Sequence, residues 1–96
     1  GKGSTVATLV WLLRQQGLNV GSYTSPHVLH FQERIQINGI PVSDEALSSA
    51  FEQVAACRGD VFLSYFEWST LAAFILFKKY RDSNHQPLDV LVLEVG

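Results

Sequence analysis

Residues 1–24 read GKGSTVATLVWLLRQQGLNVGSYT, a glycine-rich start followed by a helical pattern and a short strand-like segment. The helical pattern runs from about Ser4 to Gly17, a favourable C-terminal residue, and its apolar positions are Val6, Leu9, Val10 and Leu13. Residues 18–24 mix β-branched, aromatic and small side chains as strands do, and Ser25-Pro26 ends the segment. This order predicts a βαβ unit whose first strand precedes Gly1.

Two further helices and a hairpin are predicted in the middle of the chain. Arg34-Ile35-Gln36-Ile37 alternates polar and apolar residues before Asn38-Gly39, a strong hairpin signal. One helix is expected from a Ser43 cap to Arg58-Gly59, with an apolar face of Leu47, Ala50, Phe51 and Val54. The other is expected from about Phe66 to Tyr80, and we predict that it is largely buried because it is apolar all round.

The last apolar run occupies residues 88–95 and contains Val90-Leu91-Val92-Leu93. A nearly continuous run of this kind predicts a parallel strand covered on both faces. With the preceding elements it predicts an α/β fold with a mainly parallel sheet flanked by helices.

Composition limits the classes of function. The 96 residues allow one domain, and 47% hydrophobic with 17% charged residues is compatible with a packed core. A net charge of -2 provides no basic field for nucleic acid, so we expect no such partner. The single cysteine, Cys57, fits the reducing cytoplasm. The longest apolar stretch, Leu71 to Phe77, is far shorter than the roughly 20 residues of a membrane helix, so we expect no membrane partner.

The segment Gly1-Lys2-Gly3-Ser4-Thr5 has the chemistry of a phosphate site. Glycines let backbone N–H groups approach an anion, a helix N-terminus adds partial positive charge, and Lys2 would neutralise the outer phosphates. The usual P-loop has Ser or Thr directly after its Lys, whereas Gly3 intervenes here. A glycine-rich helix cap that binds nothing explains the segment equally well.

Three other features could contribute to a site. Glu94 closes the last predicted strand and could hold Mg²⁺, although an acid there also serves solubility. Ser25-Pro26-His27 follows the earlier strand and could face the same crevice, or be an ordinary turn. Glu67 lies among aromatic residues that could stack on a flat heterocycle, but we favour a helix-start acid beside core aromatics. The sequence contains no cluster of His or Cys suited to a metal.

Five short blocks in order carry a family resemblance. They are Gly1-Lys2-Gly3-Ser4-Thr5, Tyr23-Thr24-Ser25-Pro26-His27, Glu33-Arg34-Ile35, Ser64-Tyr65-Phe66-Glu67 and Leu93-Glu94-Val95-Gly96. Together they resemble the dihydrofolate synthase/folylpolyglutamate synthase family of the Mur ligase superfamily. In that family the loop reads Gly-Thr-Asn-Gly-Lys-Gly-Ser or Thr, so the resemblance accounts for Gly3 and makes Gly1 the fourth loop residue.

The resemblance implies a P-loop-containing, Mur-ligase-like central domain and an ATP-dependent ligase. ATP would phosphorylate a carboxylate of dihydropteroate or folate, and L-glutamate would attack the acyl phosphate. By position, ATP would be bound by Gly1, Lys2, Gly3, Ser4 and Thr5, with Lys2 as the catalytic cation. Mg²⁺ would be held by Ser4, Ser25 and Glu94. The folate would contact His27, Arg34, Phe66 and Glu67.

The resemblance also implies that residues 1–96 are part of the ATP-binding domain, truncated at both ends, without the C-terminal glutamate-binding domain. We therefore expect the chain alone to be inactive and monomeric. A strand before Gly1 would lie beside the 88–95 strand, and its absence would leave strand edges unpaired. Two alternatives remain: a peptidoglycan-precursor Mur ligase, and a P-loop phosphotransferase or nucleotide-binding module that makes no amide. The residues do not separate dihydrofolate synthase from folylpolyglutamate synthase activity.

Overall fold

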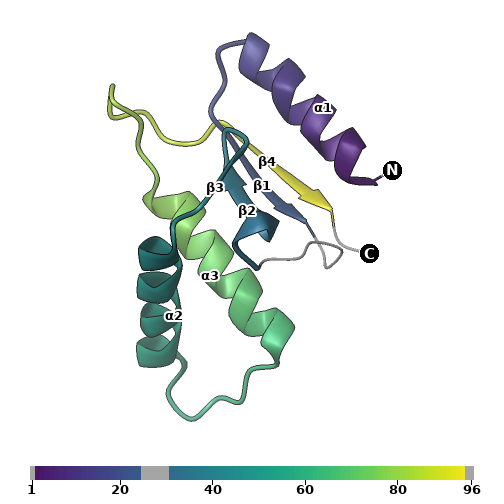
Figure 1. Ribbon diagram of the computed structural model, residues 1–96. Helices are drawn as coiled ribbons and strands as arrows, with labels where there is room; N and C mark the ends of the chain where they lie inside the picture. Colours follow the sequence, from purple (N-terminus) through teal and green to yellow (C-terminus); the bar gives the residue numbers. More distant parts are fainter. Residues whose placement is uncertain (1, 25–30, 95–96) are drawn as a thin grey trace.

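The computed structural model describes the backbone of residues 2–24 and 31–94 and the side chains of residues 5–24 and 33–94 (Figure 1). The elements are, in order, α1 (Lys2–Gln15), β1 (Val20–Thr24), the 3-10 helix η1 (Phe31–Arg34), β2 (Ile35–Ile37), β3 (Ile40–Pro41), α2 (Asp44–Arg58), α3 (Tyr65–Lys79) and β4 (Val90–Glu94). Every helix and strand predicted within residues 1–96 is present, with bounds within two residues of those expected.

The strands form one sheet in the order β3-β2-β1-β4. β1 pairs in parallel with β4, whereas β1 with β2 and β2 with β3 are antiparallel. The predicted hairpin is confirmed, since Asn38 and Gly39 both have the positive φ that a tight primed turn requires. The α/β class is confirmed, but the expectation of a mainly parallel sheet is wrong for the described residues. The sheet is mixed because the hairpin adds two antiparallel pairs to the single parallel one.

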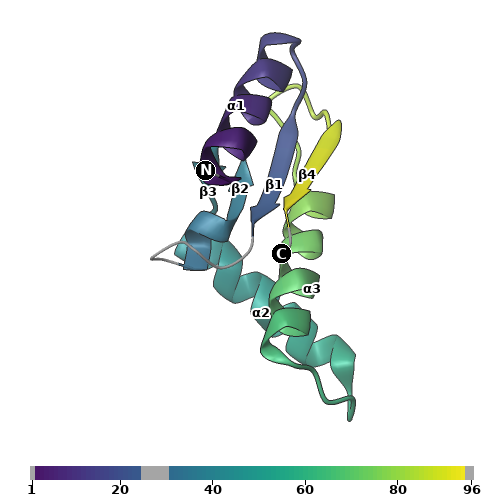
Figure 2. The same cartoon turned by 90° about the vertical axis from the view of Figure 1, so that its right-hand side faces the viewer.

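Helices cover the sheet on both faces: α1 lies on one, and α2 and α3 lie on the other (Figures 1 and 2). Alternation along β1 assigns its side chains to these faces. Tyr23 belongs to the core under α2 and α3. Gly21 faces the same way, because a Cβ there would lie 2.8 Å from Phe77 Cδ1. Ser22 and Thr24 face α1.

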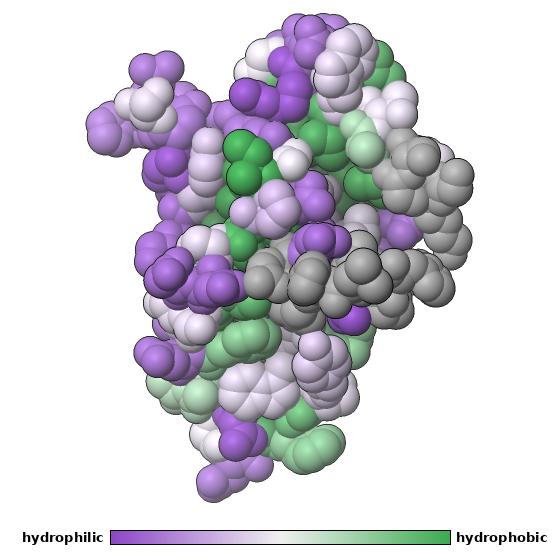
Figure 3. Space-filling model, viewed as in Figure 1, coloured by the Kyte–Doolittle hydropathy of each residue, from purple (hydrophilic) through white to green (hydrophobic). Residues whose placement is uncertain are grey.

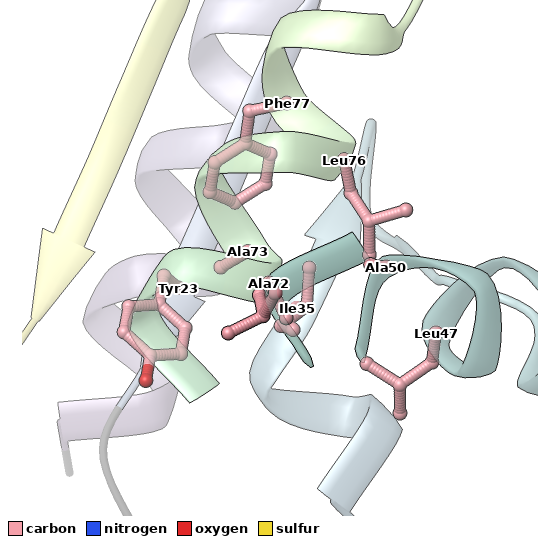
Figure 4. Close-up of a cluster of buried hydrophobic side chains, with 9 residues drawn as sticks. Tyr23, Ile35, Leu47, Ala50, Ala72, Ala73, Leu76 and Phe77 are labelled. Carbon is pink, nitrogen blue, oxygen red and sulfur yellow. The ribbon is translucent and has the colours of Figure 1, made fainter. Parts of the chain in front are cut away.

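The hydrophobic core lies between the sheet and the α2–α3 pair. Figure 4 shows Tyr23 and Ile35 from the sheet meeting Ala72, Ala73 and Phe77 of α3, with side chains of α2 beside them. Leu47, Ala50 and Val54 are buried on α2, which confirms the predicted apolar face. Serines cap both helices: Ser43 accepts from the backbone N–H of Ala46, and Ser64 from that of Glu67.

Part of the expected burial is absent in the described structure. The prediction that the second long helix is largely buried is wrong for one side of α3, where Leu71 is 43% exposed and Phe74 is 41% exposed. β4 is not covered on both faces either, since Leu91 and Leu93 are 41% and 49% exposed. β4 is an edge strand of the described sheet, so its side chains have a neighbouring strand on one side only. Figure 3 shows hydrophobic surface beside the sheet and at the lower end of the helical layer.

The edge position of β4 is where the sequence places a neighbouring strand from before Gly1, and that pairing stays a prediction. Among the described residues, no helix combines the length and apolarity needed to cross a bilayer.

Candidate functional site

The start of α1 lies at the same end of the molecule as the carboxyl ends of β1 and β4 (Figures 1 and 2). Its first turn contains Lys2, Gly3 and Ser4 and has no acidic residue. The free N–H groups and the partial positive charge of a helix N-terminus are therefore not offset by a carboxylate of that turn. This is the arrangement expected of an anion site at the carboxyl edge of a sheet.

Glu94 reaches this end of the sheet through the register of the parallel pair. Thr24 is paired with Glu94, and Ser22 with Val92. Residues paired in register point to the same face, so Glu94 lies on the α1 face beside Thr24. Both side chains are half-buried. A carboxylate and a hydroxyl are therefore adjacent at the strand ends on the side of the sheet where α1 begins.

A cavity of about 510 Å³ separates α1 from the sheet. Its walls come from α1, β1, η1, β2 and the β2–β3 turn. The lining residues are Val6, Ala7, Val10, Trp11, Arg14, Ser22, Thr24, Glu33, Gln36, Asn38 and Gly39. This cavity was not predicted from the sequence. The usable signal was the alternation in β1, where Ser22 and Thr24 place hydroxyls on one face and Gly21 and Tyr23 face the other.

Glu67, predicted to contact folate, closes a capping box at the start of α3. Its Oε1 accepts from the Ser64 N–H at 2.8 Å, and its own N–H donates to Ser64 Oγ at 3.2 Å. The Ser64 backbone donor, followed by the Ser64 hydroxyl, holds the pKa of the Glu67 carboxyl below its ordinary value. The carboxylate thus has the helix-start role that we favoured on chemical grounds.

Of the other predicted folate residues, Arg34 and Phe66 are among those described, and both lie toward the carboxyl edge of the sheet. Arg34 directly precedes Ile35, which pairs with Tyr23 near the end of β1. Phe66 is exposed and comes about one helical turn before Thr70, whose hydroxyl is 3.1 Å from the Tyr23 hydroxyl. Arg34 and Glu94 therefore lie at the carboxyl edge of the sheet, and Phe66 and Glu67 lie in the first turn of α3, about one helical turn before the residue that contacts Tyr23. Phe66 and Glu67 belong to the helical layer opposite α1.

Several predicted site residues lie wholly or partly outside the described residues. Gly1, Ser25 and His27 lie outside the described residues, and Lys2, Gly3 and Ser4 are described as α1 backbone only. Thr5 is exposed and is the fourth residue of α1. The roles assigned to all of these residues stay predictions.

The donor set near Glu94 suits one kind of metal site. Within the part of the chain that the structure describes, no group of three or more His, Cys, Asp or Glu side chains could hold an ion. An all-protein cage of that type is therefore excluded for those residues. One carboxylate with neighbouring hydroxyls fits Mg²⁺, which takes one or two protein carboxylates and completes its shell with phosphate oxygens and water.

Comparison with known proteins gives a consistent result. No protein-family model matches the chain. The dihydrofolate synthase/folylpolyglutamate synthase of Buchnera aphidicola subsp. Acyrthosiphon pisum is 47% identical over 96 residues, which is 100% of this chain and 22% of that protein. The chain thus spans about a fifth of the length of this curated relative.

Solved structures agree in fold and sequence. A bifunctional folylpolyglutamate synthase/dihydrofolate synthase with Mn, AMPPNP and L-glutamate bound superposes with a TM-score of 0.87 at 46% identity, over 99% of this chain and 22% of that one. Escherichia coli FolC in complex with DHPP and ADP gives a TM-score of 0.84 at 41% identity, over 99% of this chain and 22% of the other.

The fold, with a helix starting beside the carboxyl ends of two parallel strands, defines the class as a Mur-ligase-like α/β domain. The sequence identity to these relatives is 46–47% in alignments that span 99–100% of the chain, and within the class it points to one family. Over its whole length the chain matches about a fifth of dihydrofolate synthase/folylpolyglutamate synthases, and the resemblance based on the five sequence blocks is confirmed.

Proposed function

We propose that the full-length protein is an ATP-dependent ligase that adds L-glutamate to dihydropteroate, to folate polyglutamates, or to both. The γ-phosphoryl group of ATP passes to a substrate carboxylate, which gives an acyl phosphate and ADP. The glutamate amine then attacks the acyl carbon and loses a proton, and phosphate leaves as the amide forms. The observation that carries the proposal is the in-register Thr24–Glu94 pair beside the start of α1, in a chain that matches this family over its whole length.

Positioned positive charge is the main requirement of this chemistry. In the proposal, the backbone of residues 1–3 cradles phosphate oxygens, helped by Ser4 and Thr5, and Lys2 neutralises the transferred group. Mg²⁺, held by Ser4, Ser25 and Glu94, would supply the further positive charge that neutralises the phosphate oxygens. Neighbours crystallised with AMPPNP and Mn support a nucleotide and a divalent cation at this kind of site.

The substrate carboxylate would approach from the side of η1 and the start of α3. Arg34 is half-buried at this edge, and a guanidinium matches carboxylate geometry with two parallel donors. Exposed Phe66 offers an aromatic face for the pterin ring. Glu67 would act through the capping box that orients the first turn of α3, and His27 would contribute from the loop after β1.

The same proposal assigns a role to each domain of the full-length protein. Residues 1–96 would supply part of the ATP-binding domain, and a C-terminal domain would bind glutamate. We further propose that the protein is a monomer and that it is cytoplasmic. The free, exposed Cys57 is in keeping with a reducing compartment.

The direct test is ADP release by the full-length protein, measured with dihydropteroate and then with a tetrahydrofolate as acceptor. We expect release that requires L-glutamate together with at least one acceptor, and the preferred acceptor separates the two activities. Release that required a uridine-nucleotide-linked acid would instead identify a peptidoglycan-precursor ligase. Phosphoryl transfer without amide formation would identify a phosphotransferase, and either result would overturn the proposal.

A further inference from the structure

Asn19 is a buried polar residue at the end of the sheet opposite Glu94, immediately before β1. Its backbone N–H donates to Asp89 Oδ2 at 2.7 Å, and its carbonyl accepts from the N–H groups of Asp89 at 2.8 Å and Val90 at 3.2 Å. Asn19 is therefore bonded on both sides of its backbone to the residues where β4 begins.

The side chain of Asn19 extends this contact to the loop that leads from α3 into β4. Its Nδ2 donates to Asp82 Oδ2 at 2.8 Å and to the Pro87 carbonyl at 3.2 Å. Its Oδ1 accepts from Asn38 Nδ2 at 3.3 Å. One side chain thus joins the start of β1 to the α3–β4 loop and to the hairpin turn.

Asp82 makes the loop a compact unit. Its Oδ1 accepts from the backbone N–H groups of Asn84 at 2.7 Å and Gln86 at 2.9 Å. The Asp82 backbone N–H donates to the Gln86 carbonyl at 2.9 Å, and its carbonyl accepts from His85. Because these hydrogen bonds hold the loop in one conformation, they fix which residues at the start of β4 lie beside Asn19.

The hydrophobic pattern of β4 specifies its register weakly. Valine and leucine alternate along residues 90–93, so both faces of the strand are apolar, and Leu91 and Leu93 remain exposed. A slip of one residue would exchange apolar side chains for apolar side chains, yet it would turn Glu94 to the opposite face of the sheet. A slip of two residues would keep the face but shift the carboxylate by about 7 Å along the strand.

We propose that the clasp formed by Asn19, Asp82 and Asp89 sets the register of β4 on β1 and thereby positions Glu94 as a metal ligand. Asn19 and Asp82 are positioning residues, because they act from the far end of a five-residue strand pair. The inference rests on the proposed function, since it takes Glu94 as a ligand of the divalent cation.

An exchange of donor and acceptor tests the clasp in the full-length protein. Asn19→Asp places two carboxylates against each other. Asp82→Asn replaces one acceptor oxygen by an NH₂ group, so that a donor faces either Asn19 Nδ2 or the backbone N–H groups of Asn84 and Gln86. The double variant restores one hydrogen bond with donor and acceptor exchanged. The readouts are the affinity for Mn²⁺ in the presence of AMPPNP, the affinity for AMPPNP without metal, and thermal unfolding.

We expect each single variant to lower Mn²⁺ affinity about 10-fold, the lower end of the losses found when a metal ligand is misoriented, with metal-free AMPPNP affinity unchanged. The double variant should recover most of the loss. The matched control is Val54→Ala, which destabilises the core between α2 and α3 and should leave Mn²⁺ affinity unchanged at a temperature where the protein is folded. If Asn19→Asp does not fold, Asp82→Asn gives the same comparison.

The inference is overturned if the folded single variants keep wild-type Mn²⁺ affinity, or if metal-free AMPPNP affinity falls in parallel. Glu94→Gln separates this failure from that of the proposed function. If Glu94→Gln loses Mn²⁺ affinity and the clasp variants do not, the clasp is wrong and the ligand assignment stands. If Glu94→Gln keeps Mn²⁺ affinity, the ligand assignment itself is wrong, and the positioning inference falls with it.

Discussion

The two faces of β1 differ in chemistry although they alternate residue by residue. Gly21 and Tyr23 face α3, where no space remains for an added Cβ at Gly21. Ser22 and Thr24 face α1 across a cavity of about 510 Å³. The packed face holds the sheet to α2 and α3, whereas on the open face Ser22 is buried at the cavity wall and Thr24 and Glu94 are half-buried. The five residues of β1 thus contribute to the packed core on one face and to the candidate site on the other. Substitutions on the first face should mainly lower the free energy of unfolding, and those on the second should do so less.

The largest effect is expected on the packed face. Phe77 is buried against Gly21, so Phe77→Ala should lower the free energy of unfolding by about 3–5 kcal/mol through lost burial and a cavity. Urea denaturation measures the change. Phe74→Ala on the exposed side of the same helix is the control and should cost clearly less.

A direct comparison of the two faces uses neighbouring residues of β1. Gly21→Ala would bring its Cβ within 2.8–2.9 Å of Phe77, Leu88 and Leu91, and overpacking of this kind costs about 1–3 kcal/mol. Ser22→Ala, which faces the cavity, should cost less. Equal losses for the two variants, measured by the same denaturation, would mean that the faces are not distinct.

A smaller effect is expected where the helical layer begins. Ser64→Ala removes the hydroxyl that accepts from the Glu67 N–H and should cost about 1 kcal/mol. Because Glu67 also bonds to the Ser64 backbone, Glu67→Gln should retain part of the capping box. Thermal unfolding of both variants distinguishes the cap from a folate contact, since a cap residue alters stability without altering the KM for the acceptor.

The smallest effect on stability is expected when Asp82 is protonated at acidic pH. The Asn19 amide, followed by the Gln86 N–H, holds the pKa of Asp82 below its ordinary value. A carboxyl whose pKa is lower in the folded than in the unfolded state adds stability above the unfolded pKa of about 3.9. That contribution is lost as the pH falls through the folded-state pKa. Thermal unfolding between about pH 5 and pH 2 should therefore show a smaller pH dependence for Asp82→Asn, and an unchanged profile would contradict the role of Asp82.

Local signals explain what the sequence could predict. Asn38-Gly39 identified the hairpin, and Ser43 marked the start of α2, because turns and caps depend on a few adjacent residues. The exposure of Leu91 and Leu93 was missed because an apolar run does not reveal whether both faces are covered. Asn19 was also missed, since its partners Asp82 and Asp89 lie 63 and 70 residues further along the chain. The five blocks predicted the candidate site residues, but the side chains of residues 1–4 and 25–32 lie outside the described structure.

We propose that Glu94 at the end of β4, together with Ser4 and Ser25, holds the divalent cation used with ATP. The most direct measurement is Mn²⁺ affinity of the full-length protein with AMPPNP, compared between Glu94→Gln and Glu52→Gln. Glu52 lies on the exposed side of α2 and provides the same chemical change away from the sheet. We predict a loss of about 10-fold or more for Glu94→Gln and no change for Glu52→Gln. Wild-type Mn²⁺ affinity in Glu94→Gln would contradict the claim.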